Sequence, residues 1–253
     1  MQAKGTALVT GGAKRIGRTI VEDLAANGYA VAIHANSSFA EAEALANSLR
    51  AAGADAYAVQ ADLCKAEGMT ALIAQATDLA GPIDLLVNNA SVFEHDALGE
   101  LSEDVWDRHF DIHVKAPAFL AQAFAAALPS GTNGLIVNMI DQRVWRLTPN
   151  FFSYTLSKSA LWTATRTMAQ ALAPQIRVNG IGLGPTLKSA RQNEDDFARQ
   201  QEAVPLRHGA ALTEIGATIR YLAENGSITG QMIALDGGQH LAWETPDVAG
   251  IAE

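Results

Sequence analysis

Apolar and polar positions follow two alternating patterns along the chain. Short runs of β-branched and apolar residues recur, and the longer stretches between them carry apolar residues three or four positions apart. Such short runs are typical of buried strands, and the longer stretches are typical of amphipathic helices. Strands that alternate with helices predict βαβ units around a parallel sheet. We therefore predict an α/β fold with six or seven such units.

The predicted elements cover most of the chain. The predicted strands are residues 7–10, 29–34, 55–62, 83–91, 134–141, 176–182 and 231–238. The predicted helices are residues 16–27, 39–53, 102–128, 152–173 and 213–225. Residues 187–205 have only weak apolar periodicity and lie between two prolines, so we predict an excursion outside the sheet there. Long excursions of this kind are often substrate lids.

The composition is that of an ordinary globular domain, with 49% apolar and 18% charged residues. A chain of 253 residues is long enough for one full core, so we predict a single domain over residues 1–253. The formal net charge of -9 disfavours nucleic acid and anionic membranes, because both repel an acidic protein. A small-molecule substrate is the partner that remains.

Cysteine usage points to a reducing compartment. The single cysteine, Cys64, cannot form an intrachain disulfide, and no Cys/His cluster has metal-ligand spacing. The opening residues, MQAKGTALVTGG, contain an apolar run too short for a signal peptide or a membrane span. These features predict a cytoplasmic protein without a metal site.

A glycine turn, TGGAKRIG at residues 10–17, lies between the first predicted strand and helix. Backbone N–H groups and a helix N-terminus hold pyrophosphate at such a place, whereas glycines alone could mark a purely steric turn. The second strand ends in HANSS, without the acid that binds the ribose 2′-hydroxyl of NAD. Lys14 and Arg15 add positive charge, so we predict NADP(H); basic residues that merely solvate a loop are the alternative.

Tyr154 and Lys158 are four residues apart in a predicted helix and therefore share a face. A nearby ammonium favours the phenolate and lowers a tyrosine pKa from about 10, which makes the phenol a usable acid. Taken alone, such a pair is most often an exposed helical pair. The glycine turn upstream favours a catalytic pair.

These motifs resemble those of the short-chain dehydrogenase/reductase family over essentially the whole chain. TGGAKRIG is similar to the family's TGxxxGxG, NNAS at 88–91 to its NNAG, Tyr154 and Lys158 to its YxxxK, and LGPT at 183–186 to its PG segment. The resemblance implies a single-domain Rossmann fold, a doubly wound parallel sheet of about seven strands with helices on both faces. It also implies hydride transfer from a nicotinamide, a proton from Tyr154, a lysine that binds the nicotinamide ribose, and a homotetramer.

The resemblance implies a set of cofactor-binding residues, with Asp62 at the adenine. They are Gly11, Lys14, Arg15, Ile16, Gly17, His34, Asn36, Ser37, Ser38, Asp62, Leu63, Asn89, Ala90, Ser91, Lys158, Gly184 and Thr186.

Departures from the family pattern resemble the pteridine reductase and dihydromonapterin reductase branch. Asp141 stands thirteen residues before the tyrosine, where the family has serine, and Arg15 stands at a turn glycine. Phe93 follows NNAS, and His113 takes the place of a helix asparagine. The branch implies that Arg15, Phe93, Asp141 and Tyr154 bind a pterin, and that the catalytic residues are Tyr154, Lys158, Asp141 and His113. Ser37 replaces that branch's arginine for the 2′-phosphate, so NADP preference depends on Lys14, Arg15 and Ser38.

A physical argument for a pterin starts from Asp141. An ionised carboxylate cannot donate a hydrogen bond to the oxyanion that forms in ketone reduction, unless the acid stays protonated. A pterin has a reducible C=N bond and N–H groups that a carboxylate binds. We therefore predict an NADPH-dependent pterin reductase. The alternatives are a general carbonyl or 3-oxoacyl-thioester reductase and a non-catalytic cofactor-binding homologue.

Each singled-out residue also has a purely structural interpretation. Asp141 can cap a turn with Arg143, as aspartate often does. Phe93 can be a core residue, and His113 a hydrogen-bonded buried histidine.

Overall fold

The computed structural model describes residues 4–189, 191–245 and 249. The predicted domain, residues 1–253, and the predicted excursion, residues 187–205, therefore each include residues outside the described ranges.

Seven parallel strands form one sheet in the order β3-β2-β1-β4-β5-β6-β7. They are β1 (Thr6–Val9), β2 (Ala30–Ala35), β3 (Ala56–Gln60), β4 (Leu85–Asn88), β5 (Gly134–Asp141), β6 (Ile176–Leu183) and β7 (Met232–Leu235). Every neighbouring pair is parallel. The predicted doubly wound parallel sheet is confirmed.

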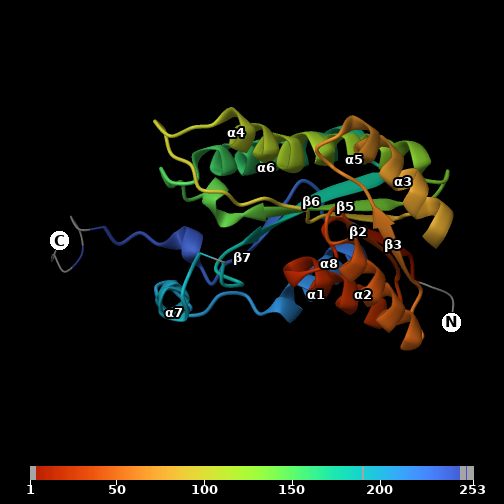
Figure 1. The fold of residues 1–253 in the computed structure, drawn as a ribbon, viewed down its shortest axis with the longest axis horizontal. Helices are drawn as coiled ribbons and strands as arrows, with labels where there is room; N and C mark the ends of the chain where they lie inside the picture. The colour runs from red at the N-terminus through yellow and green to blue at the C-terminus, as the bar shows by residue number, and fades with distance from the viewer. Residues whose placement is uncertain (1–3, 190, 246–248, 250–253) are drawn as a thin grey trace.

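Helices cover both faces of this sheet (Figure 1). They are α1 (Arg15–Ala26), α2 (Phe39–Ala51), α3 (Ala66–Ala80), α4 (Glu103–Phe110), α5 (Ala116–Ala127), α6 (Phe152–Leu172), α7 (Glu194–Glu202) and α8 (Leu212–Glu224). One layer contains α3, α4, α5 and α6, and the opposite layer contains α1, α2 and α8 (Figure 1). The helix α7, within the predicted excursion, stands outside both layers. No helix in the described part of the chain is long and apolar enough to span a membrane.

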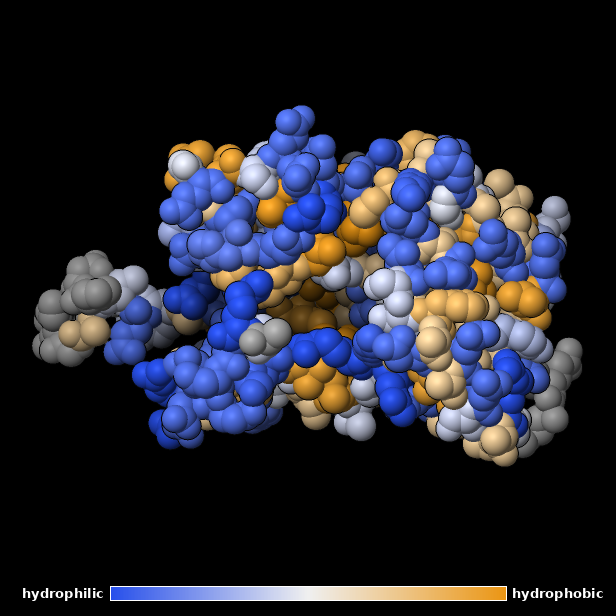
Figure 2. Space-filling model, in the orientation of Figure 1, coloured by the Kyte–Doolittle hydropathy of each residue, from blue (hydrophilic) through white to orange (hydrophobic). Residues whose placement is uncertain are grey.

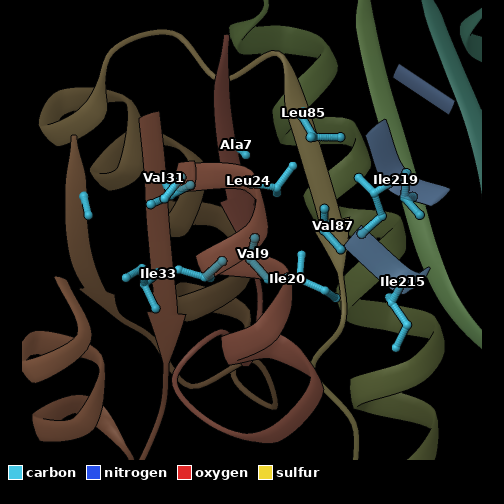
Figure 3. Close-up of a cluster of buried hydrophobic side chains, with 14 of the residues drawn as sticks. Ala7, Val9, Ile20, Leu24, Val31, Ile33, Leu85, Val87, Ile215 and Ile219 are labelled. Atoms are coloured by element: carbon cyan, nitrogen blue, oxygen red, sulfur yellow. The ribbon is translucent and has the colours of Figure 1, made fainter. Parts of the chain in front are cut away.

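Two apolar cores lie between the sheet and its helical layers. Successive side chains of a strand point to opposite faces, so each of the strands β1 to β6 contributes to both cores. Val9 packs with Ile20 of α1 and Ile219 of α8 in the first core (Figure 3). Leu8 packs with Phe124 of α5 in the second. The strands β1, β2 and β4 are buried along their whole length and therefore on both faces, which explains their nearly continuous apolar runs.

Two helices were not predicted: α7, which lies within the predicted excursion, and α3. The structure contains α3 between β3 and β4, with Met69, Leu72, Ile73 and Ala76 buried against the second core. Their spacing of i, i+3, i+4 and i+7 is the helical signal that the prediction missed.

The helix predicted over residues 102–128 is divided in three. Ser102 caps α4, because its hydroxyl accepts a hydrogen bond from the Val105 N–H. A π-helical segment, η1 (Asp111–Lys115), then separates α4 from α5. Pro117 has no N–H to donate to the carbonyl of His113, so regular α-helical pairing cannot run through this point.

A crevice is expected where the chain reverses its direction of strand addition, between β1 and β4. The glycine turn follows β1, and the Asn89 segment follows β4. Residues after the carboxyl ends of these two strands therefore border the place where an open α/β sheet binds its ligands.

Candidate active site

The glycine turn is tied to the end of β4. The Thr10 hydroxyl accepts hydrogen bonds from the N–H groups of Asn89 and Ala90, each 2.9 Å away. The Asn89 amide donates in return to the carbonyls of Thr10, at 2.9 Å, and Gly11, at 3.1 Å. Asn89 thus holds the shape of the turn that borders the crevice.

Three positions in the turn have unusual backbone requirements. Gly11 has a φ of +61°, and a Cβ on Gly17 would lie 2.0 Å from the Gly11 carbonyl oxygen. Arg15 has a φ of 51°, in the left-handed region that favours glycine. For a residue with a Cβ this conformation costs about 1–2 kcal/mol. The arginine is therefore held at a place where a glycine would be free of strain.

One cavity, of about 380 Å³, lies beside the turn and the carboxyl end of β2. Most of its lining comes from predicted cofactor-binding residues, namely Gly11, Lys14, His34, Asn36, Ser37, Ser38, Leu63, Ala90 and Ser91. Cys64, Val92, Arg108 and Ile112 line it as well and were not predicted. We call this the turn-side cavity.

His34 supports the floor of this cavity. Its Nδ1 accepts from the Gly11 N–H at 3.2 Å, so its Nε2 carries the proton and donates to the Ala61 carbonyl at 3.1 Å. Burial lowers the pKa of His34 to about 4. The imidazole is therefore neutral at physiological pH and acts as a structural bridge between β1, β2 and β3.

Acid should destabilise the protein partly through His34. The folded-state pKa lies below the unfolded value, so its stabilising contribution is complete above pH 6.5 and is lost as pH falls towards 4. The shift corresponds to about 3 kcal/mol of unfolding free energy. In His34→Gln the side-chain amide can also accept from the Gly11 N–H but does not titrate. Between pH 6.5 and pH 4 we expect the free energy of unfolding, measured with urea, to fall by about 3 kcal/mol less in this variant than in wild type. As a control, the same measurement is made on a variant of His208, which is exposed. If the His34 variant, the His208 variant and wild type all lose the same unfolding free energy between pH 6.5 and pH 4, His34 does not have this role.

Positive charge near the end of β2 is partly neutralised. The Lys14 ammonium lies 2.6 Å from the Glu41 carboxylate, and both side chains are about half exposed. Glu41 was not predicted; its position in the first turn of α2, opposite a basic turn residue, was the signal available. Arg15 turns the other way, and its Nη2 donates to the Lys188 carbonyl at 2.9 Å.

The other predicted cofactor residues have local structural partners. Asp62 Oδ1 accepts from the Cys64 N–H at 3.0 Å. Ile16 packs against the first core. The Thr186 hydroxyl donates to the Gly184 carbonyl at 3.3 Å.

A second cavity, of about 410 Å³, brings together residues from distant parts of the sequence. It is lined by Arg15, Phe93, Asp141, Gln142, Arg143, Phe151, Leu183, Gly184, Pro185, Leu187, Ser189, Arg191, Gln192, Phe197, Gln200 and Gln239. We call it the aromatic cavity. Figure 2 shows this side of the molecule hollowed between α7 and the main body, with apolar surface in the hollow and hydrophilic residues around it. Three of the four predicted substrate-binding residues lie on this one cavity.

The fourth, Tyr154, is joined to the cavity through Asp141. The Tyr154 hydroxyl donates to Asp141 Oδ2 at 3.1 Å. Asp141 Oδ1 accepts from the Arg143 N–H at 2.9 Å and so caps the short helix η2 (Gln142–Val144). Asp141 therefore does both things at once: one carboxylate oxygen caps the turn, and the other contacts Tyr154.

The predicted lowering of the Tyr154 pKa is wrong for this structure. Burial raises the pKa of Tyr154 well above 10, and the Asp141 carboxylate raises it further, while Arg143 opposes the shift. The Lys158 ammonium lies 5.7 Å from the tyrosine ring centroid and donates to the Met139 carbonyl at 2.8 Å. Burial lowers the pKa of Lys158 to about 8. At neutral pH the phenol is protonated and the lysine is mainly charged.

Phe93 belongs to an aromatic cluster. Its ring stacks on Phe151 with centroids 4.3 Å apart, and it meets the Tyr154 ring edge to face with centroids 4.7 Å apart. Phe151 has a φ of 58°, an uncommon conformation for a bulky residue. No periodic signal in the sequence indicates Phe151, because the loop between β5 and α6 is irregular.

His113 is buried beneath this cluster. Its Nε2 accepts from the Val92 N–H at 3.3 Å and lies 2.9 Å from Ser91 Oγ. Its Nδ1 lies 2.9 Å from the hydroxyl of Ser157, which donates to the Tyr154 carbonyl, so Nδ1 is the protonated nitrogen. Burial, with Lys158 nearby, lowers the pKa of His113 well below 6.5. The neutral ring connects the end of β4 to the helix that carries Tyr154.

Comparison with known proteins agrees with this architecture. Residues 5–199 match the family model described as short chain dehydrogenase. Among solved structures, FolM alternative dihydrofolate reductase 1 from Brucella suis, in complex with NADP, is 60% identical with a TM-score of 0.95, covering 98% of this chain and all of the other. The protein of the same name from Brucella canis, complexed with NADP, is 59% identical with a TM-score of 0.95, covering 98% of each chain.

A second group of relatives is more distant. The 3-oxoacyl-(acyl-carrier-protein) reductase FabG of Staphylococcus epidermidis is 30% identical over 241 residues, which covers 93% of this chain and 99% of the relative.

Proposed function

The chain belongs to the short chain dehydrogenase family, and on that premise we propose that it is an NADPH-dependent reductase of a pterin such as dihydromonapterin or dihydrofolate. One observation carries the proposal: Arg15, Phe93 and Asp141 line one cavity, and Asp141 accepts a hydrogen bond from the Tyr154 hydroxyl. The two Brucella neighbours, dihydrofolate reductases in complex with NADP, support both the substrate class and the cofactor.

The residues around the glycine turn fit NADPH. The turn borders both cavities, since Gly11 and Lys14 line the turn-side cavity and Arg15 lines the aromatic cavity. The close approach of Gly17 to Gly11 leaves the N-terminus of α1 open to a pyrophosphate, which its N–H groups bind well. Lys14 and Arg15 provide charge opposite to that of phosphate. We assign the adenosine half to the turn-side cavity and the nicotinamide half to the Gly184 side of the aromatic cavity.

NADPH, when bound, supplies the hydride. We propose that the Tyr154 hydroxyl donates the accompanying proton, and that this proton goes to the nitrogen of the pterin C=N bond. The phenol of Tyr154 is protonated, as a proton donor must be, although its raised pKa makes it a weaker acid than a free tyrosine. The charged ammonium of Lys158 lies close enough to favour the phenolate that the transfer leaves behind.

Asp141 is the residue that favours a pterin over a ketone. Its carboxylate offers acceptor oxygens to the N–H groups along a pterin edge, whereas it repels a developing oxyanion. Phe93 supplies an aromatic face for the ring, and Arg15 a donor for its acceptor side. His113 keeps Tyr154 in position through Ser157.

Isotope transfer tests this function. NADPH labelled with deuterium on the transferred position of its nicotinamide is incubated with 7,8-dihydrofolate or dihydromonapterin. We expect a tetrahydropterin product one mass unit heavier, detected by mass spectrometry. NADPH oxidation without label in any pterin product would exclude the proposed reaction.

Cofactor choice should depend on Lys14. A lysine that contacts the 2′-phosphate makes a charge-assisted hydrogen bond that NADH cannot make. We expect Lys14→Gln to weaken NADPH binding about tenfold and to change NADH binding little, measured by fluorescence titration. Glu41→Gln should tighten NADPH binding, because the carboxylate then no longer competes for the ammonium. An equal loss for both cofactors, or the same loss in Arg18→Gln, would show that Lys14 does not read the 2′-phosphate.

The remaining features of the proposal concern the lid, the compartment and the assembly. We propose that residues near 187–205 close over the aromatic cavity, supported by the Arg15 hydrogen bond to Lys188. A single cysteine suits the cytoplasm. Trp243 and Leu241, which are 75% and 63% exposed, offer apolar surface for the contacts of a homotetramer.

A further inference from the structure

The aromatic cavity carries positive charge in an acidic protein. Three arginines line it, Arg15, Arg143 and Arg191, and Asp141 is the one acid among its lining residues. The whole chain has a formal charge of -9. The Asp141 carboxylate already accepts hydrogen bonds from Tyr154 and from the Arg143 backbone. A cleft of locally opposite sign attracts anions that the rest of the surface repels.

Arg143 has hydrogen-bonding capacity that the protein does not use. Its Nη1 is buried without a hydrogen-bond partner among the described residues. The neighbouring Gln142 is 5% exposed and also lines the cavity, and its Oε1 is likewise unpartnered there. Buried polar groups are nearly always hydrogen-bonded in folded proteins. Both atoms are covered by protein atoms, so a ligand in the cavity reaches Arg143 through its remaining N–H groups.

Arg191 lies at the same aromatic pair as Arg143. The Arg143 guanidinium carbon is 5.1 Å from the Phe93 centroid and 4.9 Å from that of Phe151. The corresponding Arg191 distances are 5.0 Å and 5.3 Å. Nearly equal distances to two stacked rings place both guanidiniums beside the stack, and both arginines line the cavity. Within the described residues neither arginine forms an ion pair.

The cofactor phosphates do not account for these two arginines. Lys14 and Arg15 are part of the glycine turn, where a pyrophosphate binds. Arg143 follows β5 and Arg191 follows β6, and both contact Phe93 and Phe151 rather than the turn. The two arginines are placed to bind an anionic group of a ligand that lies beside the Phe93–Phe151 stack.

We propose that the substrate is a pterin with an aromatic tail that ends in carboxylates, as in the p-aminobenzoylglutamate tail of dihydrofolate. Arg143 and Arg191 bind a tail carboxylate, and the Phe93–Phe151 pair contacts the aromatic parts of the ligand. Guanidinium groups match carboxylates in geometry as well as in charge. A pterin with a neutral polyol side chain would give neither arginine an anionic partner. This assignment rests on the proposed function and selects among its substrates.

The test compares substrates with and without the acidic tail. The quantity measured is the ratio of kcat/KM for dihydrofolate to kcat/KM for dihydromonapterin, with NADPH saturating. We expect Arg191→Gln and Arg143→Gln each to lower this ratio at least tenfold, and added salt to lower it in the wild type. The matched control is Arg199→Gln, an exposed arginine of α7 that is paired with Asp196. It should leave the ratio unchanged.

Each other outcome overturns the assignment in a distinguishable way. An unchanged ratio in Arg191→Gln, an exposed position that a folding defect would not explain, excludes the tail site even if both pterins are reduced. A matching loss of NADPH affinity in Arg191→Gln, measured by fluorescence titration, reassigns the arginine to the cofactor. Absence of turnover with either pterin removes the proposed function and this assignment with it.

Discussion

Tyr154→Phe should reduce turnover of a dihydropterin by about 100- to 10,000-fold, the range expected for loss of a general acid. The substitution keeps the ring, which packs against Phe93 and His113, and removes only the hydroxyl that donates to Asp141 Oδ2. Because the phenol is protonated at neutral pH, it is the available proton donor beside the cavity. Stopped-flow measurement of NADPH oxidation at saturating substrate reports the affected step.

The controls separate chemistry from binding. NADPH affinity should stay the same in Tyr154→Phe, because the cofactor-binding residues of the glycine turn are untouched. Tyr221→Phe removes a hydroxyl from a tyrosine that is 51% exposed on α8, and it should have full activity. A Tyr154→Phe enzyme that retains wild-type turnover would mean that another group, or water, supplies the proton.

Asp141→Ser should change the preferred substrate class. Loss of the carboxylate removes charge-assisted hydrogen bonds to the pterin and to Tyr154, each worth about 1.5–3 kcal/mol, so we expect dihydropterin kcat/KM to fall by about 100-fold. Serine offers a neutral hydroxyl that can donate to an oxyanion, so turnover of a ketone or 3-oxoacyl thioester should stay equal or rise. A serine hydroxyl can also cap η2, which limits any effect on folding.

Asp141→Asn is the matched variant for charge. It keeps the shape of the side chain and an oxygen for the Arg143 N–H, and it removes the negative charge. We expect it to lose dihydropterin reduction as Asp141→Ser does. If instead the wild type reduces 3-oxoacyl thioesters and Asp141→Ser loses that activity, Asp141 acts as a protonated donor and the carbonyl reductase alternative holds, as the 30% identical FabG relative would suggest.

The fold could be predicted because its signals are local. The central strands β1 and β4 have continuous apolar runs that are buried, and most of the helices between the strands have clear periodicity. The α3 segment carried the same signal in Met69, Leu72 and Ile73 and was overlooked. The interruption at η1 depends on a proline that was visible in the sequence, but the π-helical geometry it accompanies is not encoded by periodicity.

The candidate site could be predicted only in part. Arg15, Phe93, Asp141 and Tyr154 were selected from motif positions, and the structure brings them to one cavity or one hydrogen bond away from it. Phe151, Arg143 and Arg191 could not be assigned to the cavity, because they lie in loops or in the short helix η2, whose paths are set by tertiary packing. The direction of the Tyr154 pKa shift was wrong because it depends on burial and on the Asp141 contact, which outweigh the opposing effect of Arg143. Sequence spacing contains neither quantity.

The most direct test of the central claim is the relative specificity of the wild-type enzyme. The measurement is kcat/KM with NADPH for 7,8-dihydrofolate and for a 3-oxoacyl thioester, determined side by side on one preparation. The Asp141 carboxylate at the cavity predicts that the dihydropterin is preferred by at least about 100-fold, which corresponds to about 2.7 kcal/mol of transition-state binding. Efficient reduction of the thioester with no turnover of any dihydropterin would contradict the assignment of this cavity to a pterin.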